Sequence, residues 1–156
     1  MTWPLPCANL CAMRVKEVMR SARGIESDAT LADAAEAIQA SGCEAVPVVD
    51  RSNGEVAVRQ LVALRDLPKL RRIEASASRG HAVGHGVLEL LGALGRRPGR
   101  FPTIEPEATL TDAWGIMSDE CLTHLPVVES GQVVGMVSLI VTFAEFPLRS
   151  PAAGFW

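Results

Sequence analysis

The chain has 156 residues, of which 48% are hydrophobic and 21% charged, and its formal net charge at pH 7 is −3. This composition is typical of a globular protein and excludes a disordered chain. The small negative charge provides no general attraction for nucleic acid or a membrane surface, and with no Tyr, three Trp and four Phe the chain lacks an aromatic platform for stacking bases.

The cysteines and the N-terminal residues indicate a location. The first residues lack the basic and apolar regions of an export signal, and no run approaches the roughly 18 apolar residues of a membrane span. We therefore expect a cytoplasmic protein with reduced thiols. Cys7 and Cys11 have three residues between them and nothing nearby completes a zinc set, so a flexible arm is the alternative to a metal site there.

One stretch occurs twice. Residues 30–50 read TLADAAEAIQASGCEAVPVVD, and residues 109–129 read TLTDAWGIMSDECLTHLPVVE. The threonines that begin them lie 79 residues apart, and so do Pro47 and Pro126. The repeat keeps its register through a whole helix and into the apolar run behind it, which predicts two copies of one small α/β unit.

Each copy predicts a helix, a hairpin and a second helix. Apolar residues recur at i, i+3, i+4 and i+7 behind a Thr-x-x-Asp capping box: Leu31, Ala34, Ala35 and Ile38 follow Thr30 and Asp33, and Leu110, Ala113, Trp114 and Met117 follow Thr109 and Asp112. Strands are expected at 45–49 and 56–62, then at 125–128 and 133–137, with turns at 50–54 and 130–132. The second helices are expected at 64–70 and 139–146. Because Pro47 cannot donate to a sheet ladder, it belongs at an edge or where pairing begins.

Shorter segments flank the two copies. Residues 15–19 predict a short helix, 24–26 an edge strand and 87–94 another helix. VLELL in this last segment echoes VKEVM at 15–19 with an offset of 72, so a length change follows it. Residues 68–100 hold seven basic residues against two acidic ones; they could attract a polyphosphate or form a solvated face. His81 and His85 lie among glycines there, and a metal or haem site and a plain loop both stay open.

These features together resemble a tandem pair of cystathionine-β-synthase-type (CBS) domains, a Bateman module. The matching residues are TLADA and AVPVVD with Asp66 in the first copy, and TIEPEATLTDA and HLPVVESGQVVGMVS in the second. The resemblance implies an α/β (α+β) fold of two βαββα units packed about a pseudo-two-fold axis. It divides the chain into an arm (1–12), a first unit (13–72), a Gly-rich and basic linker (73–86), a second unit (87–146) and a tail (147–156).

The resemblance also implies where a ligand would bind. In the family, a Ser/Thr-x-x-Asp pair opens the second helix of each unit, and the acid binds ribose hydroxyls. Here the first unit has Ala63 and keeps Asp66, whereas the second keeps Ser138 and has Val141. The alternatives are a solvated surface acid for Asp66 and a helix N-cap for Ser138. The other positions that the resemblance assigns to the cleft are Gly24, Ile25, Val46, Pro47, Thr103, Ile104, His124, Leu125 and Pro126. Two interpretations of His124 stay open, a contact to phosphate or base and a half-buried strand histidine.

The function expected from the resemblance is regulation. The ligand would be an adenosine-containing small molecule such as AMP, ADP, ATP or S-adenosylmethionine, bound between the units of a stand-alone homodimer that acts on an unidentified regulated protein. The alternative is a degenerate module that serves as a ligand-free dimerisation or docking scaffold, with Trp114, Phe143 and Phe146 available for an interface. We find no nucleophile–base arrangement, phosphate loop or dinucleotide fingerprint, so the sequence argues against an enzyme and predicts no catalytic residues, resident cofactor or metal.

Overall fold

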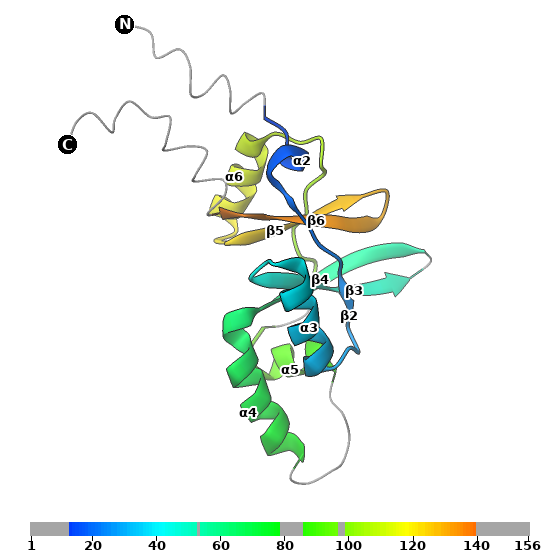
Figure 1. Ribbon diagram of the computed structural model, residues 1–156, viewed down its shortest axis with the longest axis vertical. Coiled ribbons are helices and arrows are strands. Elements are labelled where there is room, and N and C mark those ends of the chain that lie inside the picture. The colour runs from blue at the N-terminus through cyan, green and yellow to red at the C-terminus, as the bar shows by residue number, and fades with distance from the viewer. Residues whose placement is uncertain (1–12, 53, 79–85, 97–98, 140–156) are drawn as a thin grey trace, which may run out of the picture.

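The computed structural model describes residues 13–52, 54–78, 86–96 and 99–139. Its elements in chain order are α2 (Val15–Val18), β1 (Arg20–Ser21), β2 (Ile25–Glu26), α3 (Leu31–Ser41), β3 (Ala45–Ser52), β4 (Glu55–Ala63), the 3-10 helix η1 (Leu64–Asp66), α4 (Leu67–Ser78), α5 (Val87–Ala93), α6 (Leu110–Asp119), β5 (His124–Glu129) and β6 (Gln132–Ser138). The strands form two three-stranded sheets, ordered β2-β3-β4 and β1-β6-β5. Figure 1 shows the sheets one above the other, with α3, α4 and α5 on one and α2 and α6 on the other. This confirms the expected α/β pair of units.

The helix of each repeat begins as the sequence predicts. Thr30 accepts a hydrogen bond from the backbone N–H of Asp33 (3.1 Å), and the Asp33 carboxylate accepts the Thr30 N–H (3.0 Å). Thr109 and Asp112 form the same reciprocal pair at the start of α6. The helices end differently, because Gly42 takes the left-handed conformation (φ 67°) at the end of α3, whereas Cys121 takes it (φ 54°) at the corresponding place after α6. A residue with a Cβ is less favourable there than glycine.

The helices α2 and α5 are exchanged between the units. The Val15 N–H donates to the carbonyl of Ala108 (2.8 Å), and the Val87 N–H donates to that of Ala29 (2.8 Å). Val15 is buried in the core of the second repeat, and α5 is buried in the core of the first through Val87, Leu90 and Leu91. The echo between residues 15–19 and 87–91 is therefore a real structural equivalence. Helix α2 thus precedes the first repeat in the chain but packs on the second, and α5 precedes the second repeat but packs on the first.

Several expected boundaries were too short or misplaced. Strand β3 continues to Ser52 through the expected turn, and α4 continues to Ser78 rather than ending at Leu70. Residues 71–78 contain no Gly or Pro, so nothing local ends the helix there. The first hairpin is also longer by two residue pairs, Arg51 with Val56 and Ser52 with Glu55. The extra residues are thus shared between both strands.

Pro47 lies on the central strand of its sheet, where pairing with β4 begins at Ala45 but pairing with β2 begins only after the proline. It pairs with Leu61 of β4, and β2 joins β3 only at the next residue, Val48. Pro126 is placed in the same way, since it pairs with Met136 and the bridge from Ile104 begins at Val127. In both sheets the proline therefore stands just before the parallel partner joins, which agrees with the second expected placement on that side of the strand alone.

The edges of the two sheets are used differently. Strand β1 pairs with β6 at Gly135 and Met136, and a Cβ on Gly135 would lie 2.8 Å from the Arg20 carbonyl oxygen. The corresponding position on β4 is Gln60, whose side-chain oxygen instead accepts the N–H of Leu61 (3.1 Å). The chain before the second repeat reaches β4 further along, where the Phe101 N–H donates to the carbonyl of Val58 (3.1 Å). In the second sheet, Gly135 thus leaves room for β1 to pair with β6. At the corresponding place in the first sheet stands the side chain of Gln60.

Candidate functional site at the junction of the units

The ends of the strands meet at the junction of the two units. The Leu64 N–H donates to the Glu44 carbonyl (2.7 Å) at the end of the first hairpin, and the Leu139 N–H donates to the Thr123 carbonyl (2.8 Å) at the end of the second. Two hollows lie here and share Glu44 and His124, and we call them together the central cleft. The larger has a volume of about 480 Å³ and is lined by Glu44, Ala63, Leu64, Arg65, Thr123, His124 and Leu139. The smaller, about 170 Å³, is lined by Val18, Arg20, Gly42, Cys43, Glu44, His124, Met136 and Ser138.

His124 and Ser138 face each other across the second hairpin. They are partners in the register of β5 and β6, and both line the smaller hollow. The hydroxyl of Thr123 lies 3.0 Å from Nδ1 of His124, which orients the ring. Burial lowers the pKa of His124 below its usual 6.5, and the charge of Arg65 lowers it further, while Glu44 acts in the opposite direction. The imidazole is therefore neutral at pH 7 and can donate or accept one hydrogen bond.

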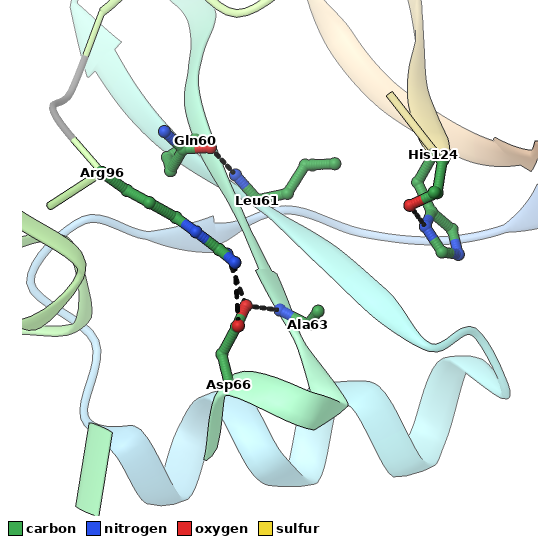
Figure 2. Close-up of polar contacts among 7 residues, drawn as sticks. Gln60, Leu61, Ala63, Asp66, Arg96 and His124 are labelled. Atoms are coloured by element: carbon green, nitrogen blue, oxygen red, sulfur yellow. Dashed lines mark hydrogen bonds and ion pairs between the residues drawn. The ribbon is translucent and has the colours of Figure 1, made fainter. Parts of the chain in front are cut away.

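Asp66 is in a different environment from His124. Only 2% of its surface is exposed, and its carboxylate is held by Arg96 through two parallel bonds, Nη1 to Oδ2 (2.5 Å) and Nη2 to Oδ1 (2.9 Å). Oδ2 also accepts the N–H of Ala63 (3.1 Å), which caps η1. Figure 2 shows the guanidinium of Arg96 facing both carboxylate oxygens, with His124 on another strand away from this pair. The residue that the resemblance assigns to ribose is thus already occupied by the chain itself.

The remaining positions assigned by the resemblance are spread over the molecule. Val46 and Leu125 have no exposed surface and belong to the two cores, and Pro47 and Pro126 are buried beside them. Gly24 borders a hollow of about 270 Å³, and Ile25 packs against the first core. Thr103 and Ile104 border a hollow of about 460 Å³ on the second unit. Of the predicted side chains, the structure brings only His124 and Ser138 together at the central cleft.

Sequence reasoning missed four polar residues of the junction. Arg20, Glu44 and Arg65 bring charges to the central cleft, and Thr123 orients His124. Glu44 and Thr123 occupy matching positions in the two copies, directly before the strand, so the alignment of the repeats could have found them. Arg96 has no counterpart in the first copy. The alignment of the repeats shows that the second copy is longer in the segment that contains Arg96, but it does not single out this residue.

Other expectations concern residues outside the described ranges. These are Cys7, Cys11, His81 and His85, together with the second helix of the second copy beyond Leu139, which carries Val141, Phe143 and Phe146. Within the described ranges, no three His, Cys, Asp or Glu side chains gather as they would around a metal ion. The same ranges contain no helix with the length and hydrophobicity to cross a membrane.

Comparisons with known structures support the fold. The crystal structure of CBSX2 in complex with AMP has 20% identity and a TM-score of 0.57, covering 84% of this chain and 93% of that one. The CBS domain pair of protein MJ0100, in complex with 5′-methylthioadenosine and S-adenosyl-L-methionine, has 18% identity and a TM-score of 0.60, covering 88% and 98%. The CBS domain of a membrane protein from Sphaerobacter thermophilus has 17% identity and a TM-score of 0.61, covering 92% and 94%. At these identities the likeness concerns the fold alone.

The family assignment comes from the sequence itself. No curated protein matches the chain. The CBS domain family matches residues 15–67 and 97–140, which together make up more than half of the chain, and it matches once in each repeat. Both matched segments contain the capped helix and the hairpin that the structure shows. The chain therefore belongs to the CBS domain family and is a tandem pair of CBS domains.

Proposed function

We propose that this CBS pair is a regulatory sensor that binds an adenosine-containing ligand, such as AMP, ADP, ATP or S-adenosylmethionine, in the central cleft. The observation that carries the proposal is the hollow of about 480 Å³ between the units, with His124 and Arg65 in its wall. Its volume lies within the roughly 300–1,000 Å³ of small-molecule sites. Two proteins with this fold are complexes with AMP and with S-adenosyl-L-methionine, which supports an adenosine ligand here as well.

The cleft offers groups for each part of such a ligand. The neutral imidazole of His124 can hydrogen-bond or stack on a base, and the nearby Ser138 provides a hydroxyl. Arg20 and Arg65 supply positive charge for a phosphate or carboxylate, and Arg20 also donates to the carbonyl of Gly42 (3.1 Å). Gly24, Thr103 and Ile104 border other hollows, Ile25 packs against the first core, and Val46, Pro47, Leu125 and Pro126 are buried, so only the resemblance assigns these positions to the ligand. A contact between ribose and Asp66 requires Arg96 to leave that carboxylate.

The wider proposal follows the family. The ligand shifts the arrangement of the units 13–72 and 87–146, or of two such chains in a homodimer, by binding one arrangement more tightly than another. The change is transmitted to an unidentified regulated protein in the cytoplasm. The module has no catalytic role in this proposal.

Titration calorimetry with AMP, ATP and S-adenosylmethionine tests the proposal. We expect binding that weakens about twofold to tenfold in Ser138→Ala, since a hydrogen bond contributes about 0.5–1.5 kcal/mol. His124→Ala should weaken it as well, whereas Ser118→Ala, an exposed serine on α6, should bind as the wild type does. The absence of both heat and a thermal shift at millimolar ligand would rule the proposal out.

The second candidate is a ligand-free dimerisation or docking scaffold. The pairing of Asp66 with Arg96 favours it, because the carboxylate needs no ligand to balance its charge. Leu64, 53% exposed at the central cleft, supplies apolar surface for a contact, and Trp114 is partly buried on α6. Light scattering distinguishes the two functions: a dimer whose mass and partner binding are unchanged by any nucleotide supports the scaffold.

A further inference from the structure

We infer that Arg96 is an internal competitor for the first-unit ligand site, the surroundings of the Asp66 carboxylate at the start of η1 and α4. The inference rests on the buried ion pair and on the way the backbone holds the arginine. It rests on the proposed function and extends it. In the ligand-free chain the central cleft with Ser138 is open, whereas the site at Asp66 is closed by Arg96.

The backbone holds Arg96 in position at the end of α5. Gly95 takes a left-handed conformation (φ 95°), its N–H donates to the carbonyl of Gly92 (3.0 Å), and the Arg96 N–H donates to that of Leu91 (3.0 Å). These two bonds form a Schellman motif, which ends a helix at a defined angle. Leu91 has no exposed surface and lies in the core of the first unit. The backbone of Arg96 is therefore anchored to the same unit that carries Asp66.

Arg96 lies in a segment that is seven residues longer in the second copy than in the first. The offset between the copies is 72 residues at the helices α2 and α5 and 79 residues at Thr30 and Thr109. In the first copy, α2 runs almost directly into β1, which pairs with β6. In the second copy, extra residues lie between α5 and Phe101, and Arg96 is one of them. The two sites of the pair consequently differ in this residue as well as in the hydroxyl and acid.

The arginine uses the same oxygens that a ribose would need. Its two N–H groups bond one carboxylate oxygen each, and Oδ2 is also bonded to the N–H of Ala63. Hydrogen bonds to charged groups favour the closed state by about tenfold to a hundredfold. A ligand that binds only when Arg96 has moved loses affinity by the same factor. Because the Arg96 side chain is 34% exposed, it can move into solvent and keep its charge hydrated.

Calorimetry with AMP on the full chain tests the inference. The wild type is expected to bind AMP in the central cleft only, whereas Arg96→Gln is expected to gain a second binding event, about tenfold or more tighter at that site than in the wild type. Adding Asp66→Asn to Arg96→Gln should remove this gain. Gly95→Ala keeps the arginine but disfavours the left-handed turn that positions it, so it should give a smaller gain. Arg72→Gln, an exposed arginine on α4, is the matched control and should bind as the wild type does.

The outcomes separate this inference from the proposed function. If wild type and Arg96→Gln bind AMP equally, with the variant folded by circular dichroism, the inference is wrong and the proposed function stands. If the wild type binds nothing and Arg96→Gln binds through Asp66, the central cleft fails as the site and the inference stands. If the wild type already uses Asp66, or if neither protein binds AMP, Arg96 is not a competitor.

Discussion

The ion pair between Asp66 and Arg96 predicts a strong coupling in stability that needs no ligand. Arg96→Gln removes two charge-assisted hydrogen bonds and leaves a carboxylate that is 2% exposed and still accepts the N–H of Ala63. Breaking a fully buried ion pair costs about 3–5 kcal/mol. Because 34% of the Arg96 side chain is exposed, we expect the lower value of about 1–3 kcal/mol for hydrogen bonds to a buried charge.

The partner variant gives a similar loss for a different reason. Asp66→Asn has nearly the same shape and keeps an oxygen for the N–H of Ala63. Its NH2 group then takes the place of one carboxylate oxygen beside the guanidinium of Arg96. Because both groups are donors, that hydrogen bond is lost. When both residues are changed, neither an unpaired carboxylate nor an unpaired guanidinium remains. The double variant should therefore lose less than the two single losses together, by about 1–2 kcal/mol.

Urea unfolding followed by far-UV circular dichroism measures this coupling. The four proteins are compared at pH 7, and the free energies of unfolding form a double-mutant cycle. Changes at independent sites add to within about 0.5 kcal/mol. Additivity within that margin would show that the pair contributes no coupling, and the argument for a closed first-unit site would then lose its energetic basis.

Two further predictions concern the sheet edge and His124. Gly135→Ala should lower the free energy of unfolding by about 1–3 kcal/mol, since its Cβ would overlap the Arg20 carbonyl oxygen of β1. The control is Gly115→Ala on α6, whose Cβ meets nothing within 4 Å and which should raise the free energy of unfolding by up to about 1 kcal/mol. Equal effects of the two changes in urea unfolding would contradict the β1–β6 contact. The lowered pKa of His124 means that the unfolded chain takes up a proton before the folded one as the pH falls through 6.5. Stability should therefore fall as the pH is lowered through 6.5. His124→Gln should show a smaller fall in its urea midpoint, and an unchanged fall would indicate that other groups cause it.

The sequence predicted those parts of the fold that depend on neighbouring residues. A capping box joins residues three apart, such as Thr30 and Asp33, and a hairpin joins strands through a short turn, so each can be identified within one copy. Pro47 was placed correctly on the β2 side of its strand alone, because its missing N–H restricts it wherever the strand lies. The end of α4 was misjudged, since no residue between Leu70 and Ser78 marks a stop and the packing of the whole unit decides how far the helix continues.

The parts that could not be predicted depend on contacts between distant segments. The exchange of α2 and α5 joins Val15 to Ala108 and Val87 to Ala29, and no local pattern specifies such a partner. Asp66 and Arg96 lie 30 residues apart. The repeat could show that the second copy has extra residues before Phe101, but it could not show that one of them reaches the carboxylate. His124 and Ser138 were brought together as expected because both lie on one hairpin.

The two halves of the pair differ in a way that is consistent with the cost of burying charge. A carboxylate with 2% exposure is stable only with a partner, and the first unit supplies one in Arg96. The second copy has Val141 at the position of Asp66, so it has no acid there to neutralise, and its Ser138 and neutral His124 can border an open hollow at little cost. The need of a buried carboxylate for a partner therefore explains why the site at Asp66 is closed and the site at Ser138 is open. The first site needs a cation whenever the ligand is absent, whereas the second needs none. A ligand in the central cleft binds without breaking an ion pair, which is why we expect binding there first.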